Sequence, residues 1–516
     1  MVTEMKVEVI CKETIKPSSP TPHHLRISNL SVFDQVTSEV YVQLLLFYPS
    51  SSDEVNNIDH RHSLFAERSI LLKTSLSETL TYFYPLAGEF KYNSSISCND
   101  HGAAFVEARV NCPISQILSR PDLGMQKQLV PNHVECRTQS GKGYLLLVQA
   151  NFFECGGVAI GVTISHKAGD AYTFCKFINS WAAIALGSTT TTDVVPPAQF
   201  GAAASLLPPL EFLNSPQPPL EFVHENCVTR RLVFNASKIA ALKSKAASAT
   251  VPNPTRVEVV SALIWKCVME ASRSNLGSVR PSAWCQVVNM RKIMVLPLTV
   301  DLLGNFFGYF VARTEESEVD HDVQSLVAEM RKGFEEFKVI FANGISGEDV
   351  LQLCKELGEL IGKVDTENNY CSTSWCRFPF YKANFGWGKP SWMSIPAGAV
   401  EIKNIISLMD ERDGNGIEAR LSLKEENMAL VESNQELLAY ASLNPSLGLE
   451  EQLCVRELAK VDIEEFVIAV STAVVVASAA TVDVAFVCFM LLWSLLWPCP
   501  LPLFALPYLA FALPYF

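Results

Sequence analysis

Apolar residues follow two different spacings between residues 144 and 187. Residues 144–153 and 158–164 are short, nearly continuous apolar runs separated by a Gly-Gly turn, which is typical of two buried strands. From Asp170 onward, bulky apolar side chains recur every three or four residues, as they do along one face of a helix. The pattern therefore predicts two strands, a tight loop at residues 166–170, and a helix.

The same two spacings predict strands and helices along most of the chain. Strands are expected at residues 5–15, 41–48, 89–110, 284–289 and 417–423. Helices are expected at residues 63–83, 236–247, 256–272, 322–341, 347–363 and 428–440.

Proline pairs set the predicted domain boundaries. Residues 187–225 are rich in proline, fit no helix or strand, and indicate an extended crossover linker. The sequence thus predicts an α/β protein with one domain over residues 1–186 and a second over residues 226–446. Residues 447–516 form a separate hydrophobic extension.

The predicted loop carries the candidate chemistry, His166-Lys167-Ala168-Gly169-Asp170. A histidine at the junction of a strand and a helix is held by rigid elements and can face a cleft. Its neutral ring can take a proton from a hydroxyl, which accelerates a reaction by about 10² to 10⁴. Asp170 either caps the following helix or pairs with a base elsewhere. With nine histidines in the chain, one such spacing by chance is unsurprising, so a structural loop histidine remains the alternative.

Composition excludes some classes of function. The 516 residues carry a net charge of −13, whereas a nucleic-acid-binding protein needs a basic face. The 15 cysteines are scattered without zinc spacing, and Cys371 and Cys376 are the nearest approach to a pair. Free thiols and an N-terminus without an apolar leader predict a cytoplasmic protein.

A second unusual stretch lies at residues 383–390, Ala-Asn-Phe-Gly-Trp-Gly-Lys-Pro. Two glycines around a tryptophan let the backbone approach a neighbour closely while the large ring fixes the turn. A β-turn with a packed aromatic ring is the plain interpretation. Such a loop can shape a pocket without taking part in a reaction.

Together these stretches resemble the BAHD family of plant acyl-CoA-dependent acyltransferases. His166 to Asp170 matches the family's H-x-x-x-D, and Asn384-Phe385-Gly386-Trp387-Gly388 matches its D-F-G-W-G with Asn in place of Asp. Shorter matches keep the family's order over residues 7–446, at residues 84–88, 289–291, 304–305 and 441–445. The chain is most similar in character to the vinorine-synthase-like branch, which acylates alkaloid and terpenoid hydroxyls, often with acetyl-CoA.

The resemblance implies two domains like chloramphenicol acetyltransferase with a channel at their interface. It implies that His166 is the general base for an acceptor that attacks the thioester of acyl-CoA. Asp170 would pair with Arg291 to hold the catalytic loop, and the loop at residues 384–388 would be structural. Acyl-CoA would be a co-substrate, with no bound cofactor, no metal and no covalent intermediate. A monomer is the family's usual state.

Three positions depart from the family pattern. Asn384 replaces an acid and is expected to weaken its loop through the loss of a charge. Glu89 stands where the family usually has Arg, a reversal of charge with no assigned consequence. Gly169 is expected to loosen a loop that should be rigid.

The extension is the largest departure. Residues 466–482 and 484–497 are apolar, with Asp483 between them, and together reach the length of one bilayer span. A spurious or alternative translated end, a membrane anchor and a loosely packed appendage all remain open. Two alternative functions follow from the departures: an inactive protein that binds CoA or another ligand, and a membrane-tethered acyltransferase.

Overall fold

The computed structural model describes residues 4–50, 58–132, 143–187, 200–214, 226–294, 302–315, 321–342, 344–363, 368–396 and 403–447. Residues 1–447 form one compact unit. The extension at residues 448–516 lies outside the described residues, and so does the apolar stretch at residues 466–497.

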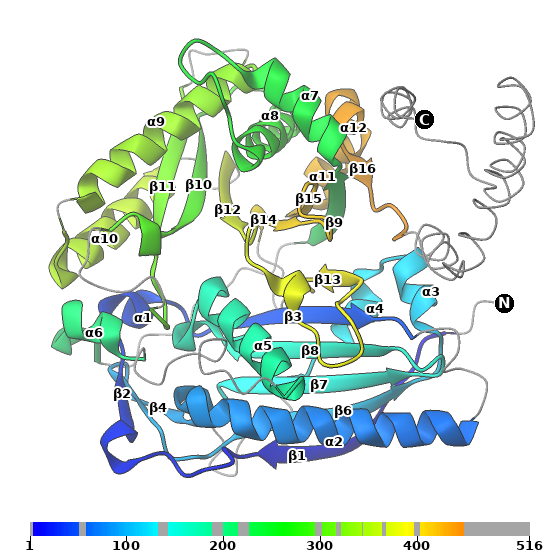
Figure 1. The fold of residues 1–516 in the computed structure, drawn as a ribbon. Helices are drawn as coiled ribbons and strands as arrows, with labels where there is room; N and C mark the ends of the chain where they lie inside the picture. Colours follow the sequence, from blue (N-terminus) through cyan, green and yellow to red (C-terminus); the bar gives the residue numbers. More distant parts are fainter. Residues whose placement is uncertain are drawn as a thin grey trace, which may run out of the picture. The chain divides into compact units, whose positions relative to one another are not determined.

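The first half of the chain folds around a six-stranded sheet (Figure 1). Only β6 and β7 run parallel, and the other neighbours are antiparallel. The strands, in spatial order, are β1 Val7–Ile15, β6 Ala103–Val110, β7 Leu146–Phe153, β8 Val158–Ser165, β3 Tyr41–Tyr48 and β13 Trp392–Ser394.

Two helices pack side by side against this sheet, α2 (Ile58–Tyr82) and α5 (Ala171–Ala185). Every residue of β7 and β8 is buried, as the continuous apolar runs predicted. The apolar face of α5 contributes Phe174, Phe177 and Trp181 to the core. This packing fixes the loop that joins β8 to α5.

A seven-stranded mixed sheet organises the second half. In spatial order it contains β11 Phe307–Thr314, β10 Ser282–Asn289, β12 Asn369–Ser374, β14 Ile405–Asp410, β15 Ile417–Lys424, β9 Cys227–Phe234 and β16 Ser442–Leu443. Its helices are α7 Ala236–Ala246, α8 Arg256–Leu276, α9 Val323–Ala342 and α10 Gly347–Lys363. The predicted α/β class with two sheet-rich halves is therefore confirmed.

Small elements complete the described part of the chain. A three-stranded sheet contains β2 Ile27–Asn29, β5 Ser95–Ser97 and β4 Glu89–Lys91. Short helices are α1 Val32–Val36, α3 Ile114–Ser119 and α4 Leu123–Lys127.

Two sequence predictions are wrong in detail. The single helix expected at residues 428–440 is divided into α11 (Glu425–Ser433) and α12 (Gln435–Tyr440), because Asn434 between them caps the second helix by accepting a hydrogen bond from Leu437 N–H. The predicted linker was expected to contain no element, yet α6 spans Ala202–Leu206 and its Ala203 and Ala204 are buried. The rest of that linker lies outside the described residues.

A buried polar network joins the two sheets. β13 comes from the second half of the sequence but pairs with β3 in the first sheet. The indole N–H of Trp392 on β13 donates to Glu418 on β15 (3.0 Å), and Nε of Arg231 lies 2.7 Å from the same carboxylate. Arg420 donates to the hydroxyl of Ser394 (2.6 Å). The charged side chains of Arg231, Glu418 and Arg420 are each 5% exposed, so one carboxylate lies between two buried guanidinium groups.

Replacing Glu418 with Gln removes the carboxylate that lies between Arg231 and Arg420 and leaves these two buried cations close together. We expect Glu418→Gln to lower the free energy of unfolding by about 3–5 kcal/mol. Urea unfolding followed by tryptophan fluorescence measures this loss. Glu426→Gln, at an exposed position of α11, is the matched control and should stay within about 0.5 kcal/mol. Equal midpoints for the two variants would contradict the account.

A bilayer-spanning helix needs about 20 largely apolar residues. The helices within the described ranges include no candidate of that kind. The predicted anchor at residues 466–497 stays a prediction.

Candidate active site

His166 lies directly after β8, in a short 3-10 turn (His166–Ala168) that leads into α5. The backbone N–H of His166 donates to the carbonyl oxygen of Val40 (2.8 Å), which ties the turn to the chain before β3. The residue is half-buried. Two rigid elements therefore hold a partly accessible imidazole in place.

Asp170 connects this loop to the second half of the chain. Its Oδ1 accepts a hydrogen bond from the backbone N–H of Thr173 (3.0 Å) and so caps α5. The same carboxylate forms two contacts with the guanidinium of Arg291, at 2.6 and 3.2 Å. Their side chains are 9% and 1% exposed. Asp170 thus does both of the things that the sequence left as alternatives.

Further contacts fix Arg291 itself. It follows β10, and its guanidinium donates to the carbonyl oxygens of Leu302 (2.8 Å) and Gly304 (3.0 Å). The ring of Tyr172 lies 4.4 Å from its central carbon. The arginine therefore binds both the loop that carries His166 and the segment that leads into β11.

The side chain of Asn305 lies between His166 and a buried carboxylate. Its Nδ2 donates to Oδ1 of Asp34 (2.9 Å) and to the carbonyl oxygens of His166 (2.8 Å) and Lys167 (3.2 Å). Its Oδ1 faces Nδ1 of His166 at 3.2 Å. Asn305 is completely buried, so this orientation depends on protein contacts alone.

These contacts determine which ring nitrogen of His166 is protonated. The three groups near Nδ2 of Asn305 are acceptors, which assigns Nδ2 to that side of the amide and Oδ1 to the imidazole. Oδ1 can only accept, so Nδ1 of His166 must donate. The lone pair of the neutral ring is then on Nε2.

Asp34 completes the network from α1. Its carboxylate accepts hydrogen bonds from the backbone and hydroxyl of Ser31 and from the backbone and side chain of Asn305. Burial raises the pKa of Asp34, and these four hydrogen bonds act in the opposite direction. The sequence analysis named Asn305 only within a short motif match and missed Asp34 altogether. Ser31 and Asp34 do have the spacing of a capping box, but that spacing indicates a helix start and gives no sign of Asn305.

An apolar cavity of about 370 Å³ lies next to Phe307, and the described residues that line it do not include His166 itself. The ring of Phe307, which lines it, is centred 5.6 Å from the imidazole. Other lining residues come from α1, β11, α9 and α10, among them Phe33, Tyr309, Phe337 and Leu353. Its size is within the range of small-molecule sites.

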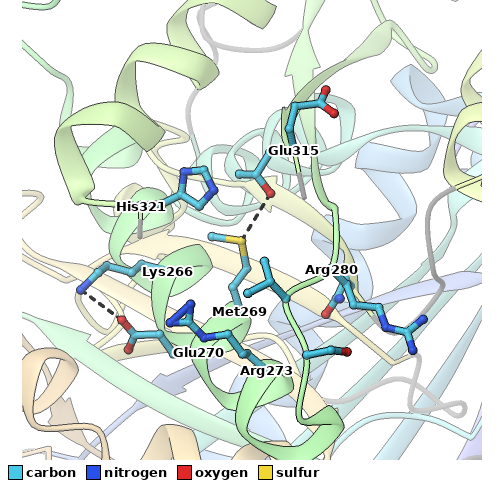
Figure 2. Close-up of a pocket in the computed structure, with 11 residues that line it drawn as sticks. Lys266, Met269, Glu270, Arg273, Arg280, Glu315 and His321 are labelled. Atoms are coloured by element: carbon cyan, nitrogen blue, oxygen red, sulfur yellow. Dashed lines mark hydrogen bonds and ion pairs between the residues drawn. The ribbon is translucent and has the colours of Figure 1, made fainter. Parts of the chain in front are cut away.

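A second cavity, of about 50 Å³, lies at α8 and the adjoining ends of β10 and β11 (Figure 2). Its wall is charged, and Lys266 and Glu270 form an ion pair across 3.2 Å there. The described residues that line it include none of the predicted site residues. The apolar cavity is linked to His166 through the ring of Phe307, which contacts the imidazole.

The loop at residues 384–388 is stabilised by one side-chain oxygen and by aromatic packing. Oδ1 of Asn384 accepts hydrogen bonds from the backbone N–H groups of Gly386 (3.0 Å) and Gly388 (2.9 Å). Both glycines have positive φ angles, +108° and +94°, which other residues rarely adopt. Phe385 is buried against Trp181, with ring centres 4.8 Å apart, and Trp387 stacks on Phe385.

The expected weakening by Asn384 rested on a lost charge, but these two contacts need only an acceptor oxygen, which Asn supplies as Asp would. The loosening expected at Gly169 stays a prediction, but the structure gives this glycine a packing reason as well. A Cβ atom there would lie 2.6 Å from Cγ2 of Thr173, whose hydroxyl both donates to and accepts from Gly304. Gly169 therefore permits a close contact within a fixed loop. Glu89, at the start of β4, accepts a hydrogen bond from the side chain of Asn99 (3.4 Å), which follows β5.

We expect Asn384→Ala to lower the free energy of unfolding by about 1–3 kcal/mol, because two backbone donors of the loop lose their acceptor. Asn384→Asp keeps the acceptor and should stay within about 1 kcal/mol of the natural protein. Urea unfolding of the two variants side by side measures the difference. Equal destabilisation by both would show that the amide, and not its oxygen, is required.

Comparisons with known proteins agree with this geometry. The family model described as "Transferase family" matches residues 5–438. Akuammiline synthase 1 of Alstonia scholaris is 41% identical over 439 residues, which are 84% of this chain and 97% of that protein. Stemmadenine O-acetyltransferase of Catharanthus roseus is 36% identical over 83% of this chain and 97% of its own length. The crystal structure of vinorine synthase matches with a TM-score of 0.73 and 34% identity, over 86% of this chain and all of that one.

Proposed function

Because this chain belongs to the BAHD family of acyltransferases, we propose that it transfers an acyl group from acyl-CoA to a hydroxyl of a specialised metabolite. The proposed acyl group is acetyl, which the name of stemmadenine O-acetyltransferase supports. The proposed acceptor is an alkaloid or a terpenoid.

One observation carries the proposal: Oδ1 of Asn305 lies 3.2 Å from Nδ1 of His166. Nε2 of the neutral ring then accepts the proton of the acceptor hydroxyl while the hydroxyl oxygen attacks the thioester carbonyl. The tetrahedral intermediate collapses as the C–S bond breaks, and the imidazolium returns its proton to the departing CoA sulfur. His166 thus acts as base and then as acid.

The other predicted site residues have positioning roles in this proposal. Asp170 and Arg291 hold the loop that carries His166. Their side chains bind each other and are not directed at Nε2 of His166. Residues 384–388 stabilise the packing of α5 through Phe385 and Trp181. In the proposed reaction none of these residues contacts the acyl group.

The apolar wall of the large cavity supports a bulky acceptor. Aromatic and aliphatic side chains dominate its lining, with Arg313 and Glu336 among the few charged residues. Burying apolar surface of a polycyclic acceptor gains about 25 cal/mol for each Å² removed from water. A small polar alcohol would gain little from the same wall.

We expect His166→Ala to lower the rate of acyl transfer by at least about 10² to 10⁴, since the general base is removed. The assay follows thiol release from acetyl-CoA with a panel of alkaloid and terpenoid alcohols. His62→Ala, at an exposed position of α2, is the control and should keep full activity. An unchanged rate of acyl transfer in folded His166→Ala would contradict the proposal. A natural protein that binds CoA but turns over no acceptor in a wide panel would favour the inactive scaffold.

Asn305→Ala tests the positioning of the imidazole separately. We expect kcat to fall about fivefold, the equivalent of one hydrogen bond of about 1 kcal/mol, while KM for acetyl-CoA stays within about twofold. Imidazole ¹⁵N NMR should show the Nδ1–H tautomer in the natural protein and a mixture in the variant. Asn151→Ala removes another fully buried asparagine with its own hydrogen bonds and is the matched control. It should lower stability without changing the tautomer. A single unchanged tautomer in Asn305→Ala would contradict the assigned role.

A further inference from the structure

Two thiols face each other on neighbouring strands of the second sheet. Cys285 on β10 and Cys371 on β12 are directly opposed in a parallel pair. Opposed residues on adjacent strands have Cα atoms about 4.8 Å apart. Disulfides form at Cα separations of about 4.4–6.8 Å, so this pair meets the distance requirement without movement of the backbone. Both cysteines are free thiols.

Both side chains lie on the face of the sheet that carries Phe307 and Tyr309. Trp284 packs into the core around α8, and successive residues of a strand point to opposite faces, so Cys285 points the other way. Burial, and then the thiols of Cys371 and Cys285, raise the pKa of Tyr309, which places the pair beside its hydroxyl. Tyr309 also lines the large cavity and meets Phe307 edge-on at 5.6 Å. The thiol pair therefore lies next to the cavity wall.

The two thiols are not equivalent. Cys285 is 4% exposed, whereas Cys371 is partly exposed. A hydrogen bond between the side chains lowers the pKa of Cys371 and raises that of Cys285. An oxidation-sensitive site needs an accessible thiol with thiolate character beside a second thiol that can resolve it. Because Cys371 is the more exposed of the two, we assign it the first role and Cys285 the second.

We infer that Cys285 and Cys371 form a reversible oxidation site behind Tyr309, next to the wall of the apolar cavity. The thiolate of Cys371 attacks one oxygen of hydrogen peroxide, which gives a sulfenic acid and hydroxide. The sulfur of Cys285 then attacks the sulfenic sulfur, forming the S–S bond and expelling the second hydroxide. With the two thiol protons, the products are one disulfide and two water molecules. A dithiol reductant reverses the reaction by thiol–disulfide exchange.

Four other thiols, those of Cys98, Cys112, Cys175 and Cys376, lack this combination. Burial raises the pKa of Cys98, Cys175 and Cys376 to about 12, so little thiolate is present at neutral pH. Cys112 is near Cys155, but burial raises the pKa of Cys112 to about 11. Cys376, the cysteine nearest to Cys371 in sequence, follows the end of β12 and is not part of the register of β10 and β12. The strand register selects Cys285 instead.

The test treats the reduced full-length protein with a small excess of hydrogen peroxide, alkylates the remaining thiols and maps the peptides by mass spectrometry. We expect one disulfide-linked peptide pair that contains Cys285 and Cys371 and that disappears after dithiothreitol. In Cys285→Ser, the resolving thiol is missing, so dimedone should label Cys371 as a sulfenic acid. Cys371→Ser should form neither product. Cys376→Ser is the matched control and should cross-link like the natural protein.

Three results would overturn the inference. They are a different cysteine pair in the cross-linked peptides, no cross-link in folded natural protein, and dimedone labelling of Cys285 ahead of Cys371. All three readouts are chemical, so the result does not depend on whether the acceptor of the acyl group has been found. Circular dichroism before peroxide treatment confirms that each variant is folded.

Discussion

The buried contact between Asp170 and Arg291 is the constraint on which the site depends. It links the loop after β8 in the first half of the chain to the segment after β10 in the second half. A buried charge needs a partner and further hydrogen bonds. Each of these groups has both, because Asp170 also accepts from the backbone of Thr173 and Phe306, and Arg291 also donates to Leu302 and Gly304. A change in the relative position of the two halves would leave both charges poorly paired.

That constraint brings Asn305 to His166. The segment held by Arg291 continues directly into Asn305, which contacts the catalytic loop and Asp34 of α1 at the same time. Positioning and chemistry are therefore divided among different residues. Buried amides and charges hold the ring, and in the proposed reaction Nε2 of the half-buried His166 is the atom that meets the acceptor hydroxyl.

Aromatic packing gives a second link between the halves. Phe385 and Trp392 come late in the sequence, yet they pack against Trp181 of α5 and Phe47 of β3. β13 adds an edge strand to the first sheet. Its Trp392 donates a hydrogen bond to Glu418 of the buried polar network. The first sheet therefore includes a strand that comes from beyond residue 226, where the second predicted domain begins. The charged residues of that network are spread over β9 and β15, where each alone looks like an ordinary polar position of a strand.

The sequence by itself determined the α/β class, most strands and helices, and His166 with Asp170 at a strand-to-helix junction. These features are local, because the apolar spacing and the capping residues act within a few positions of one another. Asn305 and Asp34, 271 positions apart, could not be linked in this way. Neither could Cys285 and Cys371, which only the parallel register of β10 and β12 makes neighbours. The tertiary structure decided the protonated nitrogen of His166 and the pairing of these thiols, because each depends on the direction of side chains that meet only after the sheets have packed.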